Sequence, residues 1–85
     1  MDFDIEAGWR LHPQVAIRPE RFGALLYHFG TRRLSFLKDR RLLCVVQRLD
    51  GSTTVEAALV DVPVEERPAF EKALATLEST GMLTS

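Results

Sequence analysis

Three side chains of the 85-residue sequence have the chemistry for nucleophilic catalysis or metal binding: His12, His28 and Cys44. A nucleophile needs a base within hydrogen-bond reach, and a zinc site needs Cys or His ligands at short spacings. The three residues fall on separate segments, so each is expected to be structural, with Cys44 a small core or half-buried residue. The five glycines are dispersed singly, which argues against a glycine-rich phosphate loop. We therefore predict no catalytic residue, no cofactor and no bound metal.

The composition is that of a folded domain. Apolar residues make up 46% and charged residues 27% of the chain, proportions that exclude a disordered protein. No apolar run approaches the ~18–20 residues needed to span a bilayer. The first six residues are acidic where a secretory signal carries positive charge, and the single cysteine forms no internal disulfide. These features predict a cytoplasmic protein that does not bind membranes.

Charge is distributed unevenly along the chain. Residues 10–48 hold nine Lys or Arg against two acids, a net charge of +7, whereas residues 49–85 carry a net charge of −5. Such a split could steer an acidic partner toward the first half. An ordinary mixed-charge surface is the alternative interpretation.

The first part of the chain predicts short strands. Residues 1–13 show no clean period and are expected to form an arm that docks through Phe3, Ile5 and Trp9. Alternating or continuous apolar residues then predict strands over 14–18, 24–29 and 32–37. Turns at 19–23 and 30–31 would connect them into an antiparallel meander.

The period changes to that of helices after residue 37. The spacing of Leu42, Val45, Val46 and Leu49 predicts a helix over about 38–49, which the glycine at 51 would end. A second helix is expected from residue 53 or 54, with Thr53 and Glu56 as a capping box. A third has Phe70, Ala73, Leu74 and Leu77 on one face and ends at Thr80-Gly81, with Met82 and Leu83 returning to the core. Pro68 suits its first turn.

The predicted fold class is therefore α+β, with a three-stranded antiparallel sheet followed by three helices. Residues 14–85 would form a single domain behind the arm. This order resembles a winged helix-turn-helix, whose usual ligand is DNA. However, residues 64–79 carry four Glu against only Arg67 and Lys72. Phosphates would repel a helix with this net negative charge, so we predict no nucleic-acid partner.

Three segments resemble the mycofactocin biosynthesis peptide chaperone family: WRLHPQVAIRPE at 9–20, FGALLYH at 22–28 and RLSFL at 33–37. More distantly, the element order resembles the chaperone of pyrroloquinoline-quinone biosynthesis. Asp-Gly at 50–51, Thr-Val at 54–55 and Gly-Met-Leu at 81–83 match that wider pattern, which covers about residues 9–84. Ala57 departs from it, because the wider family often has an acidic residue there.

The resemblance implies a recognition element for ribosomally made precursor peptides. Such a domain binds the leader of the precursor as an added strand along the third strand, against the third helix. It then presents the peptide to a radical S-adenosylmethionine (SAM) enzyme. The third strand of a meander is an edge whose free backbone groups can pair with another strand. The candidate peptide-binding residues are Arg32, Arg33, Leu34, Ser35, Phe36, Leu37, Phe70, Ala73, Leu74 and Leu77.

Two alternatives stay open at the level of sequence. The first is a DNA-binding winged helix. The second is a structural subunit whose exposed strand pairs weakly with a copy of itself as a homodimer, because an edge strand accepts either kind of strand.

Overall fold

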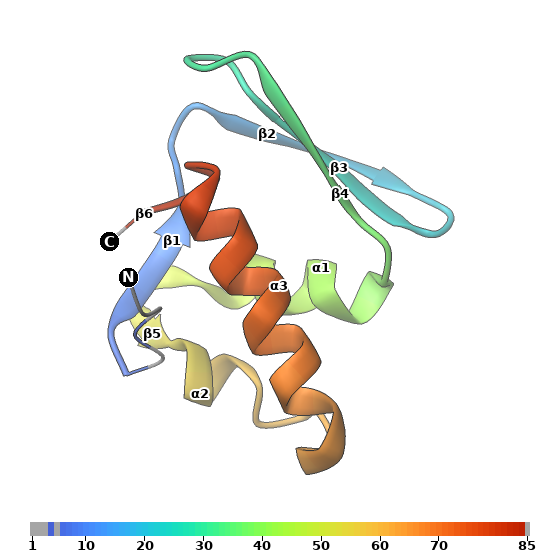
Figure 1. The fold of residues 1–85 in the computed structure, drawn as a ribbon, viewed down its shortest axis with the longest axis vertical. Coiled ribbons are helices and arrows are strands. Elements are labelled where there is room, and N and C mark those ends of the chain that lie inside the picture. The colour runs from blue at the N-terminus through green and yellow to red at the C-terminus, as the bar shows by residue number, and fades with distance from the viewer. Residues whose placement is uncertain (1–3, 5, 85) are drawn as a thin grey trace.

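The computed structural model describes residue 4 and residues 6–84, which form two small antiparallel sheets and three α-helices (Figure 1). The strands are β1 (Gly8–Leu11), β2 (Val15–Glu20), β3 (Gly23–His28), β4 (Arg33–Leu37), β5 (Asp50–Thr54) and β6 (Leu83–Thr84). The helices are α1 (Arg40–Arg48), α2 (Val55–Ala58) and α3 (Arg67–Ser79), with a 3₁₀ turn η1 (Val64–Glu66) before α3. The predicted α+β class is confirmed.

The predicted meander is confirmed as the sheet β2-β3-β4, with β3 in the centre. Side chains alternate across a strand, so one face of this sheet is buried and the other faces outward. On the buried face, Ala24 pairs with Leu37 and Leu26 pairs with Ser35. Ala24, Leu26 and Leu37 are at most 1% exposed, so this face forms one wall of the core.

A second sheet, β5-β1-β6, was not predicted from the sequence. The expectation of an irregular arm is wrong for Gly8–Leu11, which form the central strand of this sheet. Glycine is required at position 8 because a β-carbon there would collide with the carbonyl oxygen of Gly51 in β5. Trp9 packs against the core as expected, whereas Phe3 and Ile5 lie outside the described residues.

The first helix is shorter than predicted and begins after Asp39. The Asp39 carboxylate accepts a hydrogen bond from the backbone N–H of Arg41 at 2.8 Å, which caps the helix. Leu42, Val45 and Val46 are buried as their spacing indicated. Cys44 lies off this apolar stripe and is exposed, so the prediction of a core or half-buried cysteine is wrong.

The second and third helices also have identifiable caps. The hydroxyl of Thr54, not that of Thr53, accepts a hydrogen bond from the Ala57 N–H at 3.1 Å, so the predicted Thr53 capping box is wrong. The Thr53 hydroxyl instead donates to the Asp50 carboxylate. Pro68 lies in the first turn of α3, as predicted, where its missing N–H needs no partner.

The core lies between the sheet β2-β3-β4 and the helices. Its most completely buried side chains come from every layer of the fold: Leu26, Leu37, Val45, Val46, Val55, Leu59, Leu74 and Met82. Met82 and Leu83 return to this core as expected. Helix α3 runs across the molecule beside α1 and beneath the sheet β2-β3-β4, here called the hairpin sheet (Figure 1). No helix of the described part is long and apolar enough to cross a membrane.

Candidate peptide-binding groove

Strand β4 is an edge of its sheet, as the sequence predicted for residues 32–37. Within the described residues it pairs only with β3, which leaves backbone groups on its other side available to a further strand. Strand β2 is the opposite edge, but it contains Pro19, which has no N–H to donate. Of the two edges, β4 is therefore the better acceptor of another strand.

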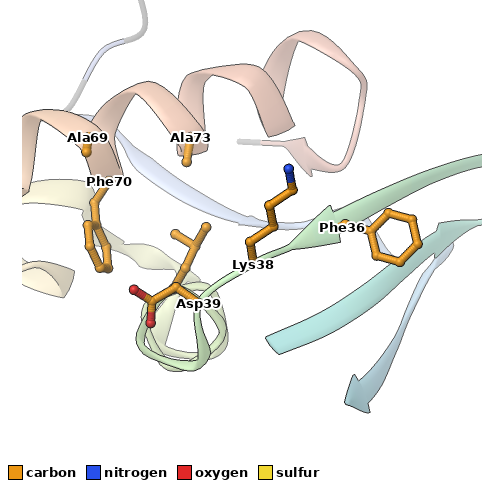
Figure 2. Close-up of a pocket in the computed structure, with 7 residues that line it drawn as sticks. Phe36, Lys38, Asp39, Ala69, Phe70 and Ala73 are labelled. Carbon is orange, nitrogen blue, oxygen red and sulfur yellow. The ribbon is translucent and has the colours of Figure 1, made fainter. Parts of the chain in front are cut away.

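A groove lies between β4 and α3. One cavity of about 320 Å³ is lined by Phe36, Lys38, Asp39, Leu42, Ala69, Phe70 and Ala73. A second, of about 280 Å³, is lined by Ser35, Phe36, Leu37, Leu42, Ala73, Thr76 and Leu77. The two cavities share Phe36, Leu42 and Ala73, so they adjoin along the edge strand. The side chains of Phe70 and Ala73 project from α3 into the first cavity (Figure 2).

The groove is mainly apolar, and the charged side chains of Lys38 and Asp39 line its first cavity. Leu42, Ala69, Phe70 and Ala73 present hydrocarbon to the first cavity. Figure 2 shows the Lys38 side chain rising from the end of β4 toward α3. A groove of this composition suits an apolar side chain beside a carboxylate.

The predicted residues of α3 are divided between core and groove. Leu74 is fully buried and Leu77 is 4% exposed, so both face the core, although Leu77 also reaches the second cavity. Phe70 is 7% exposed and lines the first cavity. Ala73 is half-buried and lines both cavities, so it lies where the two adjoin.

The predicted residues of β4 point to both faces of the sheet. Ser35 and Leu37 lie on the inner face and line the second cavity. Leu34 and Phe36 share a face, as alternation predicted, but it is the outer one, where they are 58% and 60% exposed. Phe36 borders the groove where its strand passes, while its ring points away from the cavity (Figure 2).

Arg32 and Arg33 are exposed at the far end of β4, in and after the turn from β3. Arg32 adopts a left-handed backbone conformation with φ of 60°. The turn is held by His28, which is 4% exposed and whose Nδ1 accepts hydrogen bonds from the Gly30 and Thr31 N–H groups at 3.0 and 3.1 Å. His28 therefore fixes the turn that positions the arginines.

Arg41 lies next to Phe70, a lining residue of the first cavity, and was not among the residues predicted to bind the peptide. Its guanidinium pairs with Asp39 at 2.9 Å and Glu66 at 3.0 Å, and lies over the Phe70 ring at 5.4 Å from the centroid. These hydrogen bonds hold the pKa values of both carboxyl groups below their usual range and raise the pKa of Arg41. The cluster ties the start of α1 to the start of α3.

Sequence reasoning also missed Lys38, Asp39, Leu42 and Ala69 as groove residues. Leu42 was assigned to the core from its helical spacing, and it is indeed buried. Ala69 stands one turn before Ala73, so the spacing of two small residues at i and i+4 was the available signal. The described residues contain no group of three or more His, Cys, Asp or Glu side chains that could hold a metal ion.

Comparisons with known proteins agree with this geometry. Residues 8–84 match the model of the peptide chaperone MftB family. The peptide chaperone MftB of Mycobacterium tuberculosis is 51% identical over 84 residues, which cover 96% of this chain and 77% of that protein. The peptide chaperone MftB of Mycolicibacterium smegmatis is 48% identical over 83 residues, which cover 95% of this chain and 81% of that protein.

A solved structure shares the fold. The chain of a lasso peptide synthetase B1 complexed with the leader peptide superposes with a TM-score of 0.63 and 27% sequence identity. The match covers 93% of this chain and 100% of that chain.

The fold, the family match and the named relatives are those of a peptide chaperone domain. The chain belongs to the peptide chaperone MftB family, which confirms the resemblance found in the sequence.

Proposed function

We propose that this protein binds the leader of a ribosomally made precursor peptide by adding it as a strand to the edge of β4. The observation that carries the proposal is the coincidence of the free edge with the apolar groove against α3. The solved relative complexed with a leader peptide supports the same class of ligand. An added strand would form main-chain hydrogen bonds worth ~0.5–1.5 kcal/mol each net.

Side chains of the leader would supply the remaining affinity. Alternate residues of an added strand point to the same face, so every second leader residue faces α3. An apolar leader side chain fits the cavity bordered by Leu42, Phe70 and Ala73, and a neighbouring acidic residue would meet Lys38. A peptide covering one strand and one groove buries a small area, so the complex is expected to be transient.

The proposed role of the bound state is delivery. The chaperone holds the leader while a radical SAM maturation enzyme modifies the rest of the precursor. The resemblance of residues 9–20, 22–28 and 33–37 to the mycofactocin chaperone family supports this proposal. We propose that this delivery takes place in the cytoplasm, a reducing compartment that suits the single cysteine of the sequence.

Proline substitution in β4 tests strand addition. Successive residues of an edge strand direct their N–H groups alternately toward the neighbouring strand and away from it. Of Leu34→Pro and Ser35→Pro, one therefore removes a free edge donor and the other breaks a bond to β3. The variant that stays folded by circular dichroism is expected to bind the leader at least about tenfold more weakly by calorimetry.

Two matched variants serve as controls. Ala16→Pro, if folded, places proline on the opposite edge strand β2, and Glu56→Ala changes an exposed residue of α2. Both are expected to bind the leader as the parent does. If a folded proline variant in β4 also binds like the parent, strand addition at this edge is excluded.

A further inference from the structure

The outer face of the hairpin sheet is unusually apolar for a solvent-exposed surface. Leu25 pairs with Phe36 and Tyr27 pairs with Leu34, so these four side chains lie together on the face opposite the core. Soluble monomers rarely leave a contiguous apolar face open to water without a binding role. We call these four residues and the flanking Phe22 and Phe29 the outer patch.

Aromatic contacts join the patch into one surface. The rings of Phe22 and Phe36 lie 6.2 Å apart between centroids, and those of Tyr27 and Phe29 meet edge-on at 5.1 Å. Phe22 and Phe29, in the turns at either end of β3, are 52% and 60% exposed. Since the inner face already forms the core, the outer patch is not needed to stabilise the fold.

Positive charge surrounds the patch. Arg18 pairs with Leu25 across β2 and β3, and its side chain is 79% exposed despite an ion pair with Glu20. Arg21 and Arg32 are exposed in the two turns, whereas Arg33 pairs with His28 and belongs to the inner face. The segment 14–37 thus carries four arginines against one acid. A complementary surface would have an apolar centre and carboxylates at its edge.

A second copy of the chain fits this face poorly. Two copies would oppose the same arginines, and like charges across an interface are unfavourable.

Peptide binding would enlarge the same face. A strand added to β4 continues the sheet, and alternate peptide side chains then point outward beside Leu34 and Phe36. The partner that contacts this surface would therefore touch both the chaperone and its cargo. Such a partner distinguishes the loaded from the empty chaperone.

We infer that the outer patch is the docking surface for the enzyme that modifies the bound peptide, which contacts it through an apolar surface edged by acidic residues. The inference rests on the proposed function and adds the site and the chemistry of the enzyme contact. It also makes docking dependent on the peptide: the enzyme binds the loaded chaperone more tightly than the empty one.

The test measures two affinities for each variant: leader alone, and purified radical SAM enzyme in the presence and absence of leader. Tyr27→Ser/Phe29→Ser removes one end of the patch without changing β4, and Arg18→Glu reverses the charge at its edge. Val64→Ser is the control, because Val64 is equally apolar and 69% exposed but lies in η1, outside the patch. Circular dichroism checks folding, and Phe29→Ser alone replaces the double variant if that fails to fold.

The patch variants are expected to bind the enzyme at least about tenfold more weakly. Their leader affinity should stay within about twofold of the parent, since the changes lie away from the edge. Val64→Ser should match the parent in both. If the parent binds leader and enzyme but the patch variants bind the enzyme with the affinity of the parent, the docking inference is wrong and the proposed function is not affected. If the parent does not bind the leader, the proposed function fails as well.

Two further results would overturn the inference in favour of another occupant. One is concentration-dependent dimerisation of the parent in sedimentation, abolished by the patch variants. The other is binding of the parent to vesicles containing anionic lipid, lost in the patch variants while enzyme binding is retained.

Discussion

At the scale of single residues, Arg41 joins parts of the chain that are far apart in sequence. Its guanidinium donates hydrogen bonds to Asp39, in the cap of α1, and to Glu66, just before α3. It also lies over the ring of Phe70, which lines the first cavity. Because these side chains are largely accessible to solvent, the ion pairs contribute modestly to stability. Their main effect is to connect the start of α1 to the start of α3.

The Arg41 cluster predicts a pH dependence with a definite sign. The pKa values of Asp39 and Glu66 are lowered chiefly by hydrogen bonds from Arg41. A lowered folded-state pKa stabilises the protein above the unfolded-state value, and this stabilisation is lost as the pH falls through the folded-state value. We expect Arg41→Gln to melt below the parent near neutral pH, with the difference disappearing on acidification below about pH 4.

Arg40→Gln is the matched control for that experiment. Arg40 is exposed in the same turn of α1 and makes no ion pair within the described residues. It should melt like the parent at every pH. A difference between Arg41→Gln and the parent that persists unchanged to pH 3 would show that the carboxylates are not its origin.

Residue orientation in β4 shows where sequence reasoning reached its limit. Alternation places Leu34 and Phe36 on one face and Ser35 and Leu37 on the other, and this is confirmed. It does not say which face is buried. The sheet buries Leu37 because Ala24 and Leu26 of β3 line that face. A conflict of this kind, with large apolar side chains facing water, indicates a binding surface.

At the scale of elements, local patterns predicted local structures and missed distant pairings. The meander and the stripes of α1 and α3 follow from periods within a few residues. Strands β1, β5 and β6 are short. Residues paired between β1 and β5 are at least 40 positions apart in sequence, and those paired between β1 and β6 are more than 70 apart. The sequence DGSTT of β5 favours a turn by composition. Only the tertiary partner β1 makes this segment a strand, so no local signal could have identified it.

Helix α3 stabilises the fold through the buried side of its stripe. Leu74 is fully buried between the helix and the rest of the core. Leu74→Ala should lower the free energy of unfolding by ~2–5 kcal/mol, through lost burial and the cavity left behind. Lys72→Ala, at an exposed position of the same helix, should change it by less than about 0.5 kcal/mol. Thermal or urea denaturation measures both, and equal stability of the two variants would contradict the observed packing.

The other side of α3 is predicted to determine peptide binding. Ala73 borders both cavities, so Ala73→Phe would place a ring where a leader side chain is expected. Leader affinity should fall at least about tenfold while the melting temperature stays near that of the parent, because the ring fills space that is open to solvent. Ala57→Phe, at an exposed position of α2 outside the groove, is the control. Unchanged leader affinity in Ala73→Phe would place the peptide elsewhere.

At the scale of the whole molecule, charge separates a peptide-binding domain from a DNA-binding one of similar shape. The segment from Val64 to Ser79 carries four Glu against Arg67 and Lys72. A helix with this charge would be repelled from the phosphates of a major groove. We expect duplex DNA to bind weakly and without sequence preference at physiological salt. Sequence-dependent affinity of about 10⁻⁸ M or tighter in a fluorescence polarisation titration would contradict this.

The same charge distribution predicts how an acidic leader reaches the groove. Residues 10–48 carry a net charge of +7, and Arg32, Arg33 and Lys38 stand exposed along or beside β4. Exposed charges accelerate encounter more than they stabilise the final contact, and salt screens them over a Debye length of about 8–10 Å. The association rate of an acidic leader, measured by stopped-flow fluorescence, should fall about tenfold between low and high salt.

The dissociation rate should change much less, because it reports backbone hydrogen bonds and apolar contacts in the groove. Arg32→Ser/Arg33→Ser should reproduce the slower association already at low salt, whereas Arg10→Ser, on β1 in the other sheet, should not. An association rate that is insensitive to salt, with dissociation accelerating instead, would mean that the arginines form part of the bound contact. The positive half of the chain would then act as a binding site for carboxylates and not as a guide toward the edge strand.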